Sequence, residues 1–191
     1  MEVWRANAAV ALGVEPSVVA APFDTVAVCL SKGLTGGVMP LGVTAAAQHI
    51  FDAFLDDDRS RMLYHGHSFT ANTTACAAAL ASLDLTESAE CTASRLRIAA
   101  AHTAFAATLA GNPHIADLRQ TGTILAMELS AGTASYHSSI RDAMYRFFLD
   151  RGILLRPLGH ILYILPPYCI SDEDLEYIYG SISEFLDTLG R

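Results

Sequence analysis

The sequence predicts an α/β fold, in which short apolar strands alternate with longer helices. Apolar runs rich in β-branched or aliphatic residues occur at 26–30 and 161–165, and both have the length of a buried strand. Apolar residues recur at helical spacing over 172–189, which indicates an amphipathic helix. Hydrophobic residues make up 52% of the 191 residues and charged residues 17%, so the chain has enough apolar side chain for a packed core.

The other elements follow from periodicity and from residues that begin or end helices. Helices are predicted where apolar or alanine-rich stretches have helical spacing: 6–13, 45–55, 72–85, 88–110, 138–150 and 172–189. Strands are predicted at short apolar runs: 26–30, 42–44, two strands around Gly122 within 115–129, 153–156 and 161–165. Asn72 and Ser171 are the expected N-caps of their helices, and residues 56–61 are an expected solvated loop. We expect residues 1–85 to be the remnant of a larger domain and residues 86–191 a linking helix with a small α+β domain.

The net charge and the composition limit the kinds of partner and the compartment that we expect for this protein. The net charge of −8 disfavours nucleic acid and anionic membranes, and no apolar run approaches the roughly 20 residues that span a bilayer. The N-terminus lacks the basic-then-apolar layout of a signal peptide, which predicts a cytoplasmic protein. The cysteines at 29, 76, 91 and 169 are scattered, a pattern that favours free thiols. A mean hydropathy of +0.32 is high for a soluble domain and hints at apolar surface for a partner.

Lys32 is the only lysine of the chain, and it follows the predicted strand 26–30 among small residues. A lysine at the end of a buried strand is costly to desolvate unless its charge is paired or removed. Forming a Schiff base removes the charge, and burial lowers the lysine pKa towards reactivity. The alternative is a solvated lysine in the turn after a strand.

Residues 65–70, His-Gly-His-Ser-Phe-Thr, precede the helix that begins near Asn72. Backbone amides and a hydroxyl before a helix N-terminus can bind phosphate, although serine-rich caps also occur without a ligand. His65 and His67 lack a carboxylate or cysteine partner at ligand spacing, so we do not predict a metal site.

Arg156 ends the predicted strand 153–156 and precedes Pro157. Its planar guanidinium suits a carboxylate, either of a ligand or of a glutamate within the chain. Tyr163 could line a pocket, and core packing explains it equally well.

Several blocks together resemble the class III aminotransferases, which are fold-type I enzymes dependent on pyridoxal phosphate. The blocks occur in the order of the family: Ser31–Gly37 with Met39–Val43, Tyr64–Asn72, Arg119–Ala126, Leu155–Gly159 and Ile161–Tyr168. The resemblance runs from about residue 25 to the C-terminus. It is greatest to the branch that serves biotin synthesis by moving an amino group from S-adenosylmethionine to 8-amino-7-oxononanoate.

The resemblance implies a role for each matched residue. Lys32 would hold pyridoxal 5'-phosphate, release it to the amino donor and act as the base for proton transfer. His67 and Ser68 would contact the cofactor phosphate of the other subunit of a homodimer, with Gly66 beside the substrate. Arg156 would bind the substrate carboxylate, and Tyr163 would line the pocket.

Residues 5–34 also resemble the L-threonine aldolases, but the aspartate of their Asp-Gly-Ala-Arg motif is absent and only Arg5 matches. The chain thus resembles a junction of two related enzymes at a shared lysine segment. Three alternatives stay open: an aldolase-like lyase, a non-catalytic fragment that binds a partner, and a class III aminotransferase for another amine. Much of a large domain is missing, so we expect no turnover by this chain alone.

Overall fold

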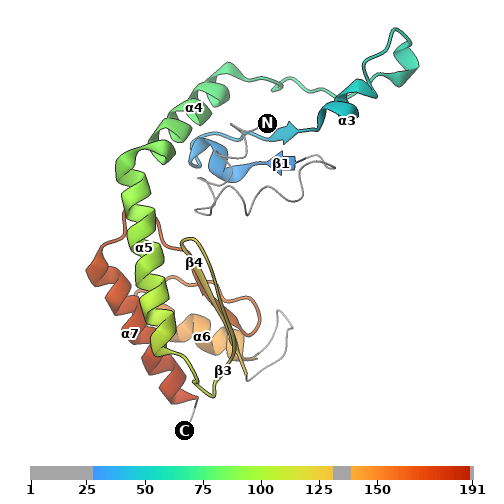
Figure 1. Cartoon of the computed structure of the whole chain (residues 1–191). Helices are drawn as coiled ribbons and strands as arrows, with labels where there is room; N and C mark the ends of the chain where they lie inside the picture. The colour runs from blue at the N-terminus through green and yellow to red at the C-terminus, as the bar shows by residue number, and fades with distance from the viewer. Residues whose placement is uncertain (1–27, 131–138, 190–191) are drawn as a thin grey trace. The chain divides into compact units, whose positions relative to one another are not determined.

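The computed structural model describes residues 28–130 and 139–189, which form α-helices, short 3₁₀ helices and two antiparallel sheets (Figure 1). The predicted helix at 6–13 and the aldolase-like leader lie outside these residues. The chain divides into two compact units, residues 1–92 and 93–191. The division falls within helix α5 (Ala89–Thr108), whereas the sequence placed the boundary after residue 85.

The first unit contains a two-stranded sheet, short helical turns and one long helix. Its elements are β1 (Val28–Leu30), the 3₁₀ helix η1 (Lys32–Thr35), β2 (Val43–Ala45), α3 (Gln48–Asp52), the 3₁₀ helix η2 (Arg59–Arg61) and α4 (Thr73–Glu87). β1 and β2 pair antiparallel, with Cys29 opposite Thr44. The turn η1 packs against α4, and a Cβ added at Gly36 would lie 3.5 Å from the Ser82 hydroxyl. This packing fixes the Lys32 turn to the long helix.

Two expectations for the first unit were wrong in burial or length. The strand at 26–30 was expected to be buried, but Cys29 is exposed because β1 pairs only with β2 among the described residues. The helix expected at 45–55 is the single turn of α3, and its apolar residues Phe51, Phe54 and Leu55 are exposed. The helical spacing of these apolar residues predicted that they would be buried against another element, but no described element covers them.

Helix α4 begins where the sequence predicted. The Asn72 side chain accepts hydrogen bonds from the backbone N–H groups of Thr74 (3.0 Å) and Ala75 (3.3 Å), as an N-cap does. Ala71, just before the cap, has a φ of 53°. Non-glycine residues rarely adopt this left-handed conformation, so the turn into α4 is tightly constrained.

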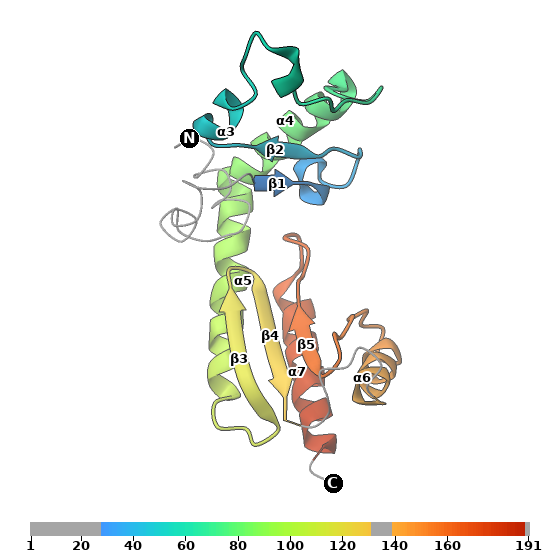
Figure 2. The same cartoon turned by 90° about the vertical axis from the view of Figure 1, so that its right-hand side faces the viewer.

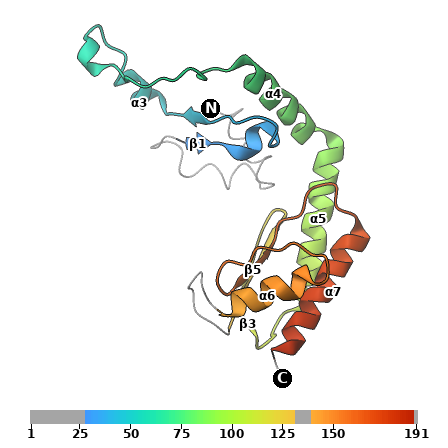
Figure 3. The same cartoon turned by 180° about the vertical axis from the view of Figure 1, so that it is seen from behind.

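The second unit packs helices on a three-stranded antiparallel sheet of order β3-β4-β5 (Figure 2). Its elements after α5 are β3 (Ile115–Thr121), β4 (Ile124–Leu129), α6 (Ser139–Leu149), β5 (Ile161–Ile164) and α7 (Asp172–Thr188). Helices α5 and α7 cover one face of the sheet, and α6 packs beside α7 (Figures 2 and 3). These elements agree with the sequence prediction except at residues 153–156.

The core of this unit follows from alternation along β4, where Leu125, Met127 and Leu129 are buried and the residues between them are not. The apolar face of α7 meets these side chains through Ile182 and Phe185. The remaining buried members come from α5 and the residue after it, from α6, β5 and α7, and from the segment between α6 and β5: Phe105, Leu109, Met144, Phe148, Ile153, Leu155, Leu162, Ile164 and Leu186.

The strand predicted at 153–156 does not form. The N–H of Ile153 donates to the Phe148 carbonyl (2.9 Å) and that of Leu155 to the Ile153 carbonyl (3.2 Å). These donors are used locally, so no ladder with β5 develops. Ile153 and Leu155 are still buried, and a tight turn with two 2.9 Å bonds between Leu158 and Ile161 leads into β5.

The tip of the β3–β4 hairpin is fastened to α5 by buried polar contacts. His102 on α5 is fully buried, and its Nε2 lies 3.0 Å from the Thr123 carbonyl oxygen. Its Nδ1 lies 2.7 Å from the Tyr179 hydroxyl on α7, and the Tyr179 ring stacks on Phe105 with centroids 4.3 Å apart. Gln120 Nε2 adds a bond to the Ala99 carbonyl (2.9 Å). One histidine therefore joins two helices and the hairpin.

Candidate functional site

Lys32 begins the turn η1 with a φ of 49°, in the left-handed region that a non-glycine residue seldom adopts. The residue is exposed, so the expected costly burial of its amine is not found. Within the described chain the amine makes no hydrogen bond and no ion pair. Such an amine is accessible for reaction with a carbonyl compound.

The turn around Lys32 is held by its neighbours. The buried Thr35 hydroxyl donates to the Met39 carbonyl (2.5 Å) and accepts from the Met39 N–H (3.2 Å). The Ser31 hydroxyl donates to the Leu41 carbonyl (3.4 Å). These bonds close the loop between β1 and β2 and leave the lysine as its free charged group.

The segment before α4 forms a turn around His67. The Thr70 N–H donates to the His67 carbonyl (3.0 Å), and the Phe69 N–H donates to His67 Nδ1 (3.1 Å). Asn72 already occupies two first-turn amides of α4, so those groups are not available to a phosphate. Ser68 is exposed, and its hydroxyl has no hydrogen bond to the described residues. The predicted phosphate site thus retains the Ser68 hydroxyl as a donor, because the Phe69 and Thr70 N–H groups bond within the turn.

Arg156 is exposed between the buried residues Leu155 and Pro157. No carboxylate of the described residues pairs with its guanidinium, and the internal glutamate partner considered from the sequence is not found. Tyr163 lies on β5 opposite Ala126, on the sheet face away from the buried Leu162 and Ile164. The second unit therefore presents an unpaired guanidinium and an aromatic side chain that is not part of the core cluster.

The predicted site residues belong to both units. Lys32, Gly66, His67 and Ser68 are in the first unit, while Arg156 and Tyr163 are in the second. The described residues contain no group of His, Cys, Asp or Glu side chains that could hold a metal ion. No described helix is long and apolar enough to cross a membrane. The cysteines at 29, 76, 91 and 169 are free, as predicted.

The sequence did not draw attention to two arginines of α5. Arg95 is buried, and its guanidinium carbon lies 6.0 Å from the centre of the Tyr168 ring. Arg97 Nη2 donates to the Ile170 carbonyl (2.5 Å), and Nη1 pairs with Asp172. These contacts hold the loop after β5 against α5. The sequence feature that could have identified them is the presence of two arginines within an alanine-rich helix.

Comparison with known proteins assigns the family. The family model "Aminotransferase class-III" matches residues 21–186. The chain belongs to the class III aminotransferases. The match begins after most of the aldolase-like leader, and these comparisons give no support to the aldolase alternative.

The curated relatives of this aminotransferase chain carry one recurring name. The adenosylmethionine-8-amino-7-oxononanoate aminotransferase of Synechococcus elongatus is 42% identical over 85% of this chain. The enzyme of that name from Nitratidesulfovibrio vulgaris is 38% identical over 81%. This chain spans only 38% and 30% of the lengths of these two relatives.

Solved structures show the same fold. The adenosylmethionine-8-amino-7-oxononanoate aminotransferase of Methanocaldococcus jannaschii has a TM-score of 0.73 and 28% identity. The alignment covers 90% of this chain and 40% of that protein's chain. An amine transaminase from an uncultivated Pseudomonas species, solved in a PLP-bound form, has a TM-score of 0.70 and 25% identity, with 82% and 37% covered. The structure is therefore part of a fold-type I aminotransferase, as the sequence predicted.

The cofactor of this family is pyridoxal phosphate, and the described residues fit it in part. The accessible Lys32 amine fits covalent attachment, and the unbonded Ser68 hydroxyl fits a phosphate oxygen. No carboxylate among the described residues is identified as the partner of the pyridine nitrogen. The described residues thus offer one amine suited to covalent attachment and one hydroxyl suited to a phosphate oxygen.

Proposed function

We propose that this chain is part of an enzyme that transfers an amino group from S-adenosylmethionine to 8-amino-7-oxononanoate, which gives 7,8-diaminononanoate for biotin synthesis. The names of the curated relatives support this reaction. The single structural observation that carries it is the accessible Lys32 amine, held in a constrained turn inside the family match.

Each proposed role follows from what the side chain presents. Bound pyridoxal phosphate supplies an electron sink for the carbon that loses its proton. Lys32 holds the cofactor, and its freed amine takes and returns that proton. Ser68 donates to the phosphate, and Gly66 leaves room for substrate. Arg156 binds the substrate carboxylate through two parallel N–H donors, because no carboxylate of the described chain occupies it.

We further propose a cytoplasmic homodimer in which His67 and Ser68 contact the cofactor of the partner subunit. The described first unit has many exposed apolar side chains, including Phe69, Leu80 and Leu85. An exposed apolar surface of this kind favours a protein partner. The small alanine side chains of α4 would permit close approach of a neighbouring backbone.

The first test concerns Lys32. Titration of the purified 191-residue chain with pyridoxal phosphate should give a saturable absorbance of the lysine-bound cofactor, and Lys32→Ala should abolish it. Arg59→Ala, an exposed cation of the same unit, should leave the absorbance unchanged. We expect no amino transfer from S-adenosylmethionine by the chain alone, because the chain spans only 38% of the length of its Synechococcus elongatus relative and no described carboxylate is identified as the partner of the pyridine nitrogen. Saturable absorbance that survives Lys32→Ala would contradict the assignment.

The second test concerns Arg156. The test uses a chimaera in which residues 28–191 replace the matching segment of the Synechococcus elongatus relative. Arg156→Lys in this chimaera should weaken binding of 8-amino-7-oxononanoate by about 1–3 kcal/mol, because lysine cannot reproduce the bidentate geometry. The measurement is the KM for that substrate, with cofactor absorbance as the check on folding.

Arg146→Lys is the matched control, since Arg146 is an exposed arginine of α6 without an ion pair among the described residues. It should leave the KM unchanged. An equal KM for Arg156→Lys and the parent chimaera would show that the guanidinium does not bind the substrate carboxylate.

A further inference from the structure

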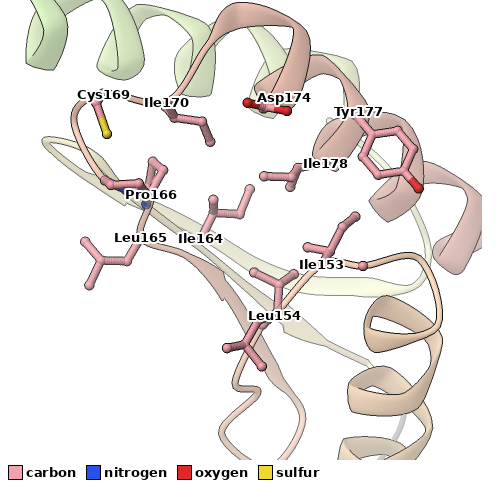
Figure 4. Close-up of a pocket in the computed structure, with 13 residues that line it drawn as sticks. Ile153, Leu154, Ile164, Leu165, Pro166, Cys169, Ile170, Asp174, Tyr177 and Ile178 are labelled. Atoms are coloured by element: carbon pink, nitrogen blue, oxygen red, sulfur yellow. The ribbon is translucent and has the colours of Figure 1, made fainter.

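A pocket of about 530 Å³ lies within the second unit, and none of the predicted site residues is among those that line it (Figure 4). Its walls come from residues 152–155, from the end of β5 with the following loop, and from the first turns of α7. Aliphatic side chains and prolines dominate these walls, among them Leu154, Leu165 and Ile170. Small-molecule pockets have this size and this apolar character.

The wall formed by the loop after β5 is fixed in place. Arg97 donates to the Ile170 carbonyl and pairs with Asp172, at the two ends of the turn that leads into α7. The Arg95 guanidinium lies against the Tyr168 ring in the middle of the same loop. The pocket therefore does not depend on a ligand to order this wall.

Asp174 is the only charged residue among the pocket's described lining residues. Its Oδ2 accepts a hydrogen bond from the Ser171 hydroxyl (2.8 Å), while Oδ1 accepts none from the described residues. The Tyr177 hydroxyl is already used, because it donates to the Arg151 carbonyl (3.1 Å). Figure 4 shows Asp174 across the pocket from Leu154 and Leu165. The pocket thus has an apolar side and one free carboxylate oxygen.

The local charge around this oxygen is negative. Asp172, Glu173 and Asp174 all lie in the first turn of α7. The helix N-terminus offsets them by only about half a positive charge, and Arg97 offsets about one more. A cation is therefore favoured at Asp174, and an anion is disfavoured.

We propose that this pocket binds an aliphatic ammonium compound, with its alkyl chain against Leu154, Leu165 and Ile170 and its ammonium donating to Asp174 Oδ1. The carboxylate supplies charge complementarity, and the aliphatic walls supply burial of the chain. The site needs neither the cofactor nor Lys32, so it is independent of the transamination proposed above.

The test uses the ¹⁵N-labelled 191-residue chain and hexylammonium chloride as the probe, followed by amide chemical shifts. We expect saturable shifts of residues 153–155 and 165–178, with a dissociation constant in the millimolar range. Butylammonium should bind more weakly, by up to about fourfold for each methylene removed. The neutral 1-hexanol and the anionic hexanoate should both bind more weakly than hexylammonium.

Two pairs of variants separate charge from shape. Asp174→Asn keeps an oxygen for the Ser171 hydroxyl and should weaken hexylammonium binding about three- to fivefold, as expected for loss of an exposed ion pair. Glu173→Gln removes a neighbouring charge outside the lining and should change binding less than twofold. Leu154→Trp should obstruct the pocket, whereas Leu96→Trp, at an equally exposed position on α5, should not.

Hexanol binding as tightly as hexylammonium would overturn the proposal, because the carboxylate would then contribute nothing. Equal effects of Asp174→Asn and Glu173→Gln would also overturn it. The proposal would also be overturned if hexylammonium, at concentrations up to about 10 mM, gave no saturable shifts, because the expected dissociation constant is in the millimolar range. The spectrum itself shows whether the second unit is folded in this experiment.

Discussion

Phe148→Ala is expected to lower the free energy of unfolding of the second unit by about 3–5 kcal/mol. Phe148 on α6 is fully buried, and its ring lies 5.3 Å from that of Phe147 and 5.7 Å from that of Phe185 on α7. Truncation removes buried apolar surface and leaves a cavity between α6 and α7. A loss of this size is a large fraction of the 5–15 kcal/mol that typically stabilises a domain.

The measurement is urea denaturation of the full chain, followed by far-ultraviolet circular dichroism. Leu154→Ala is the control: this leucine is 69% exposed, so its truncation should change the free energy of unfolding by no more than about 0.5 kcal/mol. Similar losses for the two variants would mean that the α6–α7 contact is not a core contact in solution.

Acidification is the second expected route to loss of stability, and it acts through His102. Burial lowers the pKa of His102 below its ordinary value of 6.5, and the bond to the Thr123 carbonyl offsets part of this effect. Below pH 6.5 the unfolded chain takes up a proton that the folded chain resists, so stability falls as the pH falls. At pH 5.5 the contribution of this one group is at most about 1.4 kcal/mol.

Tyr179, which contacts His102, makes the stability fall at high pH. Burial raises the pKa of Tyr179 from 10.0 to about 12, although Arg97 acts to lower it. Above pH 10 the unfolded chain releases the phenolic proton before the folded chain does, so stability falls as the pH rises further. The hydrogen bond between Tyr179 and His102 therefore contributes fully between about pH 6.5 and 10.

Urea denaturation between pH 5.5 and about 11.5 checks both limits, because the Tyr179 effect develops only above pH 10. His102→Gln should lower stability at pH 7.5 and remove the His102 part of the acid dependence. His114→Gln is the control, because His114 is a half-buried histidine near the other end of β3, and it should leave that dependence intact. If the free energy of unfolding of His102→Gln fell below pH 6.5 as steeply as that of the parent chain, the assignment would be contradicted.

Local rules allowed much of the fold to be predicted. Asn72 and Ser171 were predicted as caps because their side chains accept backbone N–H groups, and both do so in the structure. The hairpin around Gly122 and the apolar stripe of α7 were likewise predictable, because each depends on neighbours in sequence. Burial in the first unit was not predictable, since periodicity shows which face is apolar and not whether anything covers it.

For the candidate site, the sequence identified individual residues but not the contacts between residues that are far apart in the chain. Lys32 and Arg156 were identified by residue type and by resemblance, and the structure adds that neither has a charged partner among the described residues. The contacts of His102 with Thr123 and of Arg97 with Ile170 join residues far apart in sequence. No local pattern indicates such pairs, so only the folded chain could reveal them.

The two-stranded sheet β1–β2 has a consequence for the behaviour of the protein in solution. Among the described residues each strand has one neighbour, so the outer edge of each carries unpaired backbone donors and acceptors that can recruit another chain. The net charge of −8 opposes such association by mutual repulsion. Because salt at 0.1 M screens charges that lie more than about 10 Å apart, we expect higher ionic strength to weaken this repulsion and to favour edge-to-edge association.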